Sequence, residues 1–160
     1  MDRKKQVLAL IGWLAASFVA AGVGARFLPG EWYAALVKPA WTPPDWVFGP
    51  VWTVLYASMA VAAWRVWRAW RRAAAHGARG ALTAYLVQLA LNALWSYLFF
   101  GLHRPALAFL ELVALWLAIA ITLVLFWRID RLAGALLVPY LAWVTLAGSL
   151  NLALWRLNPA

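Results

Sequence analysis

The chain has 160 residues, of which 67% are hydrophobic and 12% are charged, and its mean hydropathy is +0.78. A soluble domain is about half apolar and a quarter charged, so this composition excludes most soluble folds, long disordered tails and collagen-like scaffolds. The sequence has no cysteine, which excludes disulfides, thiolate metal sites and cysteine nucleophiles, and its net charge of +9 is unevenly distributed.

Five continuous apolar segments have the length of about 20 residues that a transmembrane helix requires. They lack the alternating pattern of a membrane β-barrel, so we expect an all-α integral membrane protein, a five-transmembrane-helix bundle. The predicted spans are residues 7–25, 46–66, 81–101, 105–127 and 132–155, forming one membrane domain over residues 1–160. The first span could be a signal peptide, but its apolar run exceeds the usual length of about 7–15 residues, so we expect a retained helix.

The loop at residues 27–45 is rich in proline and aromatic residues. Proline restricts the backbone, and a solvated flexible loop would not carry two tryptophans and a tyrosine and be followed at once by a third tryptophan, Trp46. We therefore expect an ordered first loop that acts as a lid over one end of the bundle.

Polar residues within the spans should face the interior of the bundle, because lipid tails offer no hydrogen bonds. Helical spacing places them beside aromatic rings on three stripes: Trp52, Tyr56 and Met59; Gln88, Asn92, Trp95 and Phe99; and Trp143, Ala147 and Asn151, with Tyr140 just before. Two interpretations stay open from composition alone. The stripes form an aromatic pocket for a flat apolar ligand, or the amide side chains form hydrogen bonds that hold the helices together.

Glu111 is the acidic residue that lies well inside a predicted span. A carboxylate there could be a proton or cation site, but we interpret it as an interfacial group that reaches the lipid headgroups or pairs with Arg104. Pro105 suits the first turn of its helix, whereas Pro50 and Pro139 lie inside spans and predict bends.

The basic residues predict the orientation of the chain. Ten of the 14 Lys and Arg residues lie on the side of the N-terminus and of the second and fourth connections. The positive-inside rule therefore favours the cytoplasmic membrane with the N-terminus inside. The basic charge is explained by topology and by contact with the lipid bilayer, and no nucleic-acid partner is expected.

Catalytic constellations are not recognisable in the sequence. His76 and His103 lie in predicted loops, and no triad, zinc spacing, phosphate loop or carboxylate pair can be assembled. We expect no metal site and no required cofactor, so any activity would use the chemistry of a bound ligand.

Several motifs resemble one known family over essentially the whole chain. They are Trp32-Tyr33, KPAWTPP at 38–44, VWTVLY at 51–56, QLALNALW at 88–95, Phe99-Phe100-Gly101 and VPYLAW at 138–143. The sequence resembles the TspO/translocator protein family, also called tryptophan-rich sensory proteins or peripheral-type benzodiazepine receptors. Its composition is typical of a bacterial member.

The resemblance implies a membrane receptor or sensor that binds tetrapyrroles, such as protoporphyrin IX or heme, and other flat apolar ligands. It implies ligand-binding residues Tyr33, Pro43, Trp52, Tyr56, Gln88, Asn92, Trp95, Trp143 and Ala147. Light-dependent porphyrin degradation in some members makes Trp52 and Trp143 candidate catalytic, redox-active rings. The family is commonly dimeric, so we expect a homodimer, and some relatives lie in outer membranes.

Two rival functions remain open. One is a transporter that carries porphyrin or another apolar compound across the membrane, with Glu111 as a coupling residue. The other is a structural membrane subunit without a ligand.

Overall fold

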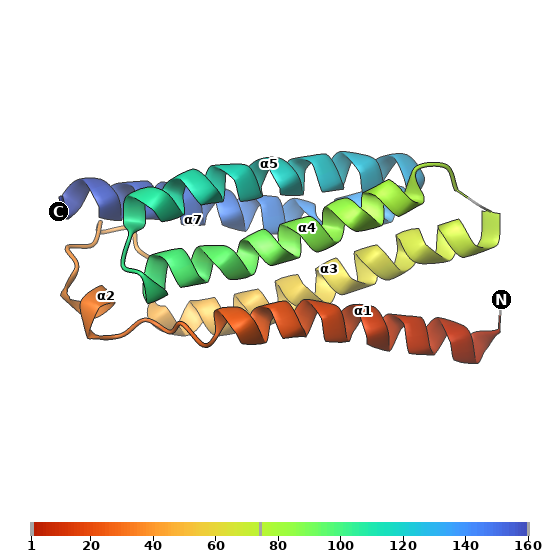
Figure 1. Cartoon of the computed structure of the whole chain (residues 1–160), viewed down its shortest axis with the longest axis horizontal. Helices are drawn as coiled ribbons and strands as arrows, with labels where there is room; N and C mark the ends of the chain where they lie inside the picture. Colours follow the sequence, from red (N-terminus) through yellow and green to blue (C-terminus); the bar gives the residue numbers. More distant parts are fainter. Residues whose placement is uncertain (1, 74, 160) are drawn as a thin grey trace.

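The structure, a computed structural model, describes residues 2–73 and 75–159. Five long helices lie side by side along the long axis of the molecule (Figure 1). They are α1 (Arg3–Gly24), α3 (Asp45–Ala73), α4 (Ala78–Ser96), α5 (Pro105–Ile129) and α7 (Val138–Leu157). Three short elements complete the chain: α2 (Glu31–Ala35), the π-helical turn η1 (Tyr97–Gly101) and α6 (Arg131–Ala135).

Five segments are long and apolar enough to cross a membrane, which confirms the predicted five-helix class. The second segment extends farthest beyond its prediction, because α3 continues past residue 66 to Ala73. Alanine and arginine, which dominate this extension, are good helix formers even where the sequence is no longer apolar. The next helix starts after Gly77, whose φ of 79° is readily adopted only by glycine.

The fifth span was predicted over residues 132–155 with a bend at Pro139, and the structure has one membrane-spanning segment there, Arg131–Leu157, in which the helix is interrupted. The chain forms α6, turns at residues 136–137, and only then enters α7. Pro139 lies in the first turn of α7 and has no N–H to donate to the carbonyl of Ala135, so a continuous helix from α6 into α7 would lose a hydrogen bond. The expected bend is thus a break before the proline. Pro105 begins α5 as predicted, and α3 continues through Pro50.

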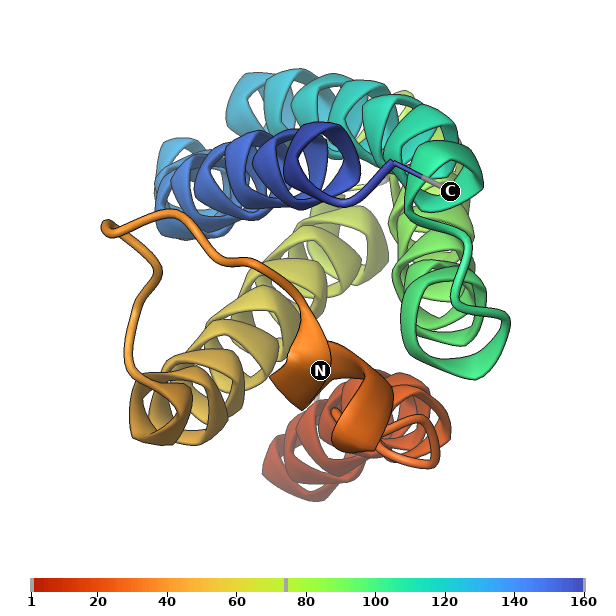
Figure 2. The same ribbon diagram turned by 90° about the vertical axis from the view of Figure 1, so that its left-hand side faces the viewer.

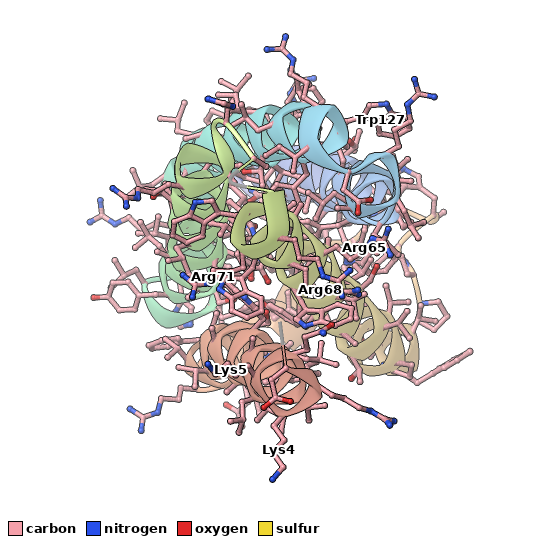
Figure 3. All side chains as sticks on the ribbon, turned by 90° about the vertical axis from the view of Figure 1, so that its right-hand side faces the viewer. Lys4, Lys5, Arg65, Arg68, Arg71 and Trp127 are labelled. Carbon is pink, nitrogen blue, oxygen red and sulfur yellow. The ribbon has the colours of Figure 1, made fainter. Side chains whose placement is uncertain are left out.

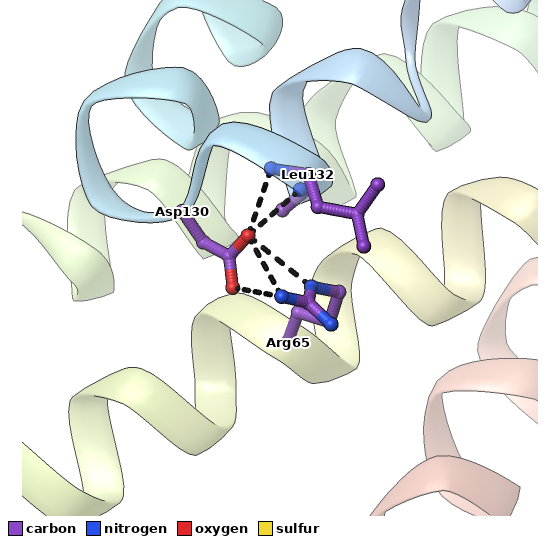
Figure 4. A network of polar contacts seen from close by, with 4 residues as sticks. Arg65, Asp130 and Leu132 are labelled. Carbon is purple, nitrogen blue, oxygen red and sulfur yellow. Dashed lines mark hydrogen bonds and ion pairs between the residues drawn. The ribbon is translucent and has the colours of Figure 1, made fainter.

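An ion pair closes the end of the bundle near the N-terminus (Figure 4). Arg65 of α3 approaches Asp130 with N–O distances of 2.8–3.2 Å, and the same carboxylate accepts the backbone N–H groups of Leu132 and Ala133. Burial alone would raise the pKa of Asp130, but these hydrogen bonds and the charge of Arg65 hold it below its usual value. Asp130 therefore fixes α3 to the start of α6.

The loop between α1 and α3 folds over the opposite end. Figure 2 shows α2 lying across this end of the bundle, after which the loop passes the C-terminal end of α7. Asn158 joins the two segments, because its side chain accepts the Val37 N–H at 2.9 Å and donates to the Val37 carbonyl at 3.0 Å. The loop is therefore ordered by specific contacts with the helices.

Candidate ligand site

Tyr140 is the centre of a buried hydrogen-bond network that joins three helices. Its hydroxyl accepts from Asn92 Nδ2 at 3.0 Å and donates to Gln88 Oε1 at 2.9 Å, while the hydroxyl of Tyr56 donates to Asn92 Oδ1 at 2.5 Å. All four side chains are buried. The amides of α4 therefore face α3 and α7, on the side that the stripes predicted.

A second amide pairs with a ring of the predicted set. Trp95 Nε1 donates to Asn151 Oδ1 at 3.0 Å, and Asn151 Nδ2 donates to the carbonyl of Pro105 at 2.8 Å. This chain of bonds holds the Trp95 ring against α7 and the start of α5. Gln88, Asn92 and Asn151 thus form hydrogen bonds between helices. This was one of the two interpretations that the sequence left open.

Aromatic rings pack around these polar groups. Trp52 lies 5.5 Å from the ring of Tyr56 and 6.2 Å from that of Tyr140. Phe48 lies 5.6 Å from Trp143, and Trp95 stacks on Phe99 at 5.2 Å. Such ring pairs prefer edge-to-face or offset geometry, so the rings form ordered walls.

Two half-buried side chains have buried polar atoms without a hydrogen-bond partner in the described part of the chain: Trp143, at Nε1, and Glu111, at both carboxylate oxygens. The interpretation of Glu111 as an interfacial group paired with Arg104 is therefore wrong. Its side chain turns into the protein rather than toward the headgroups. Because an unpartnered buried polar group is costly, both residues are candidates for contact with something that the chain does not supply.

Trp143 also lines an apolar groove of about 650 Å³ between α3 and α7. The groove is lined by Pro50, Val51, Val54, Leu55, Pro139, Ala142, Trp143 and Leu146. Ligand sites commonly have a volume of about 300–1,000 Å³ and mostly apolar walls. The groove thus offers space of the right size beside an unused indole N–H.

Comparison with known proteins decides the family. Residues 7–156 match the model of the TspO/MBR family. The chain belongs to the TspO/MBR family.

Relatives of this TspO/MBR chain come from all three domains of life. It is 47% identical to the protein CrtK of Rhodobacter capsulatus over 88% of this chain and 86% of the relative. It is 39% identical to the tryptophan-rich protein TspO of Chlorobaculum tepidum over 97% of this chain and 99% of the relative. It is 40% identical to the human translocator protein over 92% of this chain and 89% of the relative. An archaeal relative, from Archaeoglobus fulgidus, is 37% identical over 99% of both chains.

Two predicted site residues of this TspO/MBR chain, Tyr33 and Pro43, lie in the loop over the bundle, and they differ in burial. Tyr33 is 7% exposed and packs on Phe99 and Phe100, while Trp32 stacks on His103 at 4.4 Å. Burial, and then the negative charge of Asp45, raises the pKa of Tyr33. Pro43 is half-buried in the loop.

The structure therefore links most of the predicted residues, directly or through one intermediate. Trp52 contacts Tyr56, Tyr56 bonds Asn92, and Gln88 joins them through Tyr140, while Ala147 packs half-buried against the core that contains Tyr56. The predicted set omits the two residues that complete the polar network, Tyr140 and Asn151. Both lie on the predicted stripe of the last helix, and the VPYLAW motif contains Tyr140, so the signal was present in the sequence.

Proposed function

We propose that this TspO/MBR chain is a membrane receptor or sensor for tetrapyrroles, such as protoporphyrin IX or heme, and for other flat apolar ligands. The observation that carries the proposal is Trp143, which lines an apolar groove and whose indole N–H is buried without a hydrogen-bond partner in the described residues. A relative from Cereibacter sphaeroides, 45% identical over 91% of this chain, is named a tryptophan-rich sensory protein. That name supports a sensory role.

The chemistry of the lining suits a macrocycle with polar edges. Indole and phenol rings offer flat apolar surfaces for stacking, and the Trp143 N–H offers a donor for a carboxylate or carbonyl oxygen. The network of Tyr56, Gln88, Asn92 and Tyr140 satisfies its own polar groups. We infer that it mainly fixes the shape of the site, while Trp143 provides the polar contact.

Light-dependent breakdown of a bound porphyrin is a further part of the proposal. Trp52 and Trp143 are the candidate redox-active rings, and no resident cofactor is needed because the ligand absorbs the light. A time course of illumination with bound protoporphyrin IX tests this. Loss of the porphyrin absorption that slows in both Trp→Phe variants supports it, whereas equal loss in all proteins points to free photochemistry.

Binding is tested by titrating detergent-purified protein with protoporphyrin IX while its tryptophan fluorescence is measured. We expect saturable quenching, weakened severalfold in Ala147→Leu, because the larger side chain occupies space beside Trp143 and Asn151. Ala114→Leu is the matched control, since Ala114 is exposed on α5. Linear quenching, or equal quenching in Ala147→Leu, would mean that porphyrin merely partitions into the micelle.

Transport of porphyrin or another apolar compound is a second candidate, favoured by the buried and unpartnered carboxylate of Glu111. Carboxyl groups within membrane spans often act as proton or cation sites, and a human relative is named translocator protein. Glu111→Gln separates the two functions. It should abolish proton-coupled uptake into proteoliposomes if the protein is a transporter, and leave protoporphyrin binding unchanged if it is a receptor.

A further inference from the structure

The other end of the molecule holds a pocket that the proposed ligand site does not use. It lies where α1 begins and α3 ends, at the opposite end of the bundle from α2 (Figure 1). Its volume is about 590 Å³, and it is lined by Asp2, Lys5, Leu8, Ala9, Trp67 and Arg71. We propose that this pocket binds the headgroup of an anionic phospholipid.

The pocket contains two cations that the protein itself leaves unused. Neither Lys5 nor Arg71 has an ion pair within residues 2–73 and 75–159, whereas the neighbouring Arg65 pairs with Asp130 and Arg68 lies 4.4 Å from the centre of the Trp64 ring. Figure 3 shows Lys5 and Arg71 on the same flank of this end. An ammonium and a guanidinium together match the charge and oxygens of a phosphodiester.

The acidic residue of the pocket, Asp2, offsets only one of its two positive charges. The carboxylate of Asp2 accepts the backbone N–H of Lys4 at 3.3 Å, as a cap at the start of α1. The side chain of Lys4 points away from the bundle (Figure 3). The lining of the pocket therefore keeps a net positive charge.

The remaining walls fit a lipid better than a free anion. Leu8 is 67% exposed, and Ala9 and Trp67 continue the apolar surface. The N–H of Trp64 donates to the carbonyl of Gln6 at 2.9 Å, but for Trp67 no such bond is found in the described residues. An indole at this depth is typical of the membrane interface, and its N–H can reach the ester oxygens while the wall contacts the acyl chains.

The level of the pocket agrees with this assignment. α1 begins at Arg3, and the second membrane-spanning segment ends at Arg72, so Lys5 and Arg71 lie where the spans leave the hydrocarbon. Basic pockets between helices at this level are typical sites for anionic headgroups. The inference does not depend on the proposed tetrapyrrole function.

Calorimetric titration of the detergent-purified full chain with short-chain phosphatidylglycerol tests the proposal. We expect saturable binding that is about tenfold tighter than that of phosphatidylcholine with the same acyl chains, and about tenfold weaker in Lys5→Gln/Arg71→Gln. Ala9→Trp keeps every charge but fills the pocket, so it should weaken binding as well. Melting temperatures of the variants verify that they are folded.

Lys4→Gln/Arg128→Gln is the matched control, because it removes the same charge from exposed positions outside the pocket lining. It should change the affinity less than twofold. An equal loss in this control would assign binding to the general potential of the surface and overturn the proposal. Displacement of the lipid by millimolar inorganic phosphate, or equal affinity for phosphatidylcholine, would overturn it too.

Discussion

Single side chains decide how the centre of the bundle is held together. Tyr140 is fully buried, and one hydroxyl serves both amides of α4. A polar group buried at this site has no solvent-exposed surface, so a lost partner is replaced poorly. The polar residues that first suggest a ligand site therefore also hold α3, α4 and α7 in register.

Replacing Tyr140 by Phe should destabilise the protein by about 1–3 kcal/mol, because Gln88 and Asn92 then each lose a partner. Thermal unfolding in detergent measures this. Tyr97→Phe is the control, since that side chain is 41% exposed and retains its ring contact with Phe27. Equal melting of the two variants would show that the network contributes nothing.

The stripes on the third and fifth spans were predictable because helical spacing alone fixes which residues share a face. Their partners were not, since spacing along one helix does not say what lies across from it. Gln88 and Asn92 could equally have met a ligand or Tyr140. Glu111 was misinterpreted for the same reason: depth along the helix was readable, but the direction of its side chain was not.

At the level of elements, the caps and connections set where helices begin and end. Asp130 caps α6 and pairs with Arg65 of α3, so it connects two parts of the bundle far apart in sequence. Hydropathy predicted the five spans, and Pro139 predicted a bend in the last one. That the helix breaks at residues 136–137 depends on the missing N–H of this one residue, which an average over about 20 residues conceals.

Asp130 should make stability depend on pH in a defined direction. Its pKa is lowered in the folded state, so its contribution is present above the unfolded value of about 3.9 and is lost as pH falls through the folded pKa. Between about pH 5 and pH 3 the wild type should therefore lose more stability than Asp130→Asn, which keeps a capping side chain. Parallel melting curves for the two proteins over this range would refute the assignment.

The loop over the bundle should depend on Asn158. Asn158→Ala removes both bonds to Val37, so hydrogen exchange in residues 31–42 should become faster, by about tenfold for each 1.4 kcal/mol lost. Arg156→Ala, at an exposed position in the last turn of α7, is the control. Unchanged exchange in Asn158→Ala would mean that Trp32 and Tyr33 alone hold the loop.

At the scale of the whole molecule, the two ends differ in charge and in structure. The end with Lys4, Lys5, Arg65, Arg68 and Arg71 is strongly basic (Figure 3), and the other is covered by the aromatic loop. From the positive-inside rule we expect the basic end on the cytoplasmic side. Such an orientation would place the loop side of the proposed ligand site on the far face of the membrane.

Orientation can be measured directly because the chain has no natural cysteine. His76→Cys and Glu31→Cys introduce one exposed thiol at each end. In intact spheroplasts, a membrane-impermeant maleimide should label the cysteine at 31 and reach that at 76 only after lysis. The reverse pattern would contradict a cytoplasmic N-terminus.

Tetrapyrrole binding next to Trp143 is the central claim, and a titration followed at the Soret band of protoporphyrin IX tests it most directly. The wild type should show a saturable spectral shift with one site per chain, and Trp143→Phe, which loses the indole N–H, should bind severalfold more weakly. Trp155→Phe, 40% exposed at the end of α7, should bind like the wild type. Equal binding by all three proteins, or no saturation, would contradict the claim.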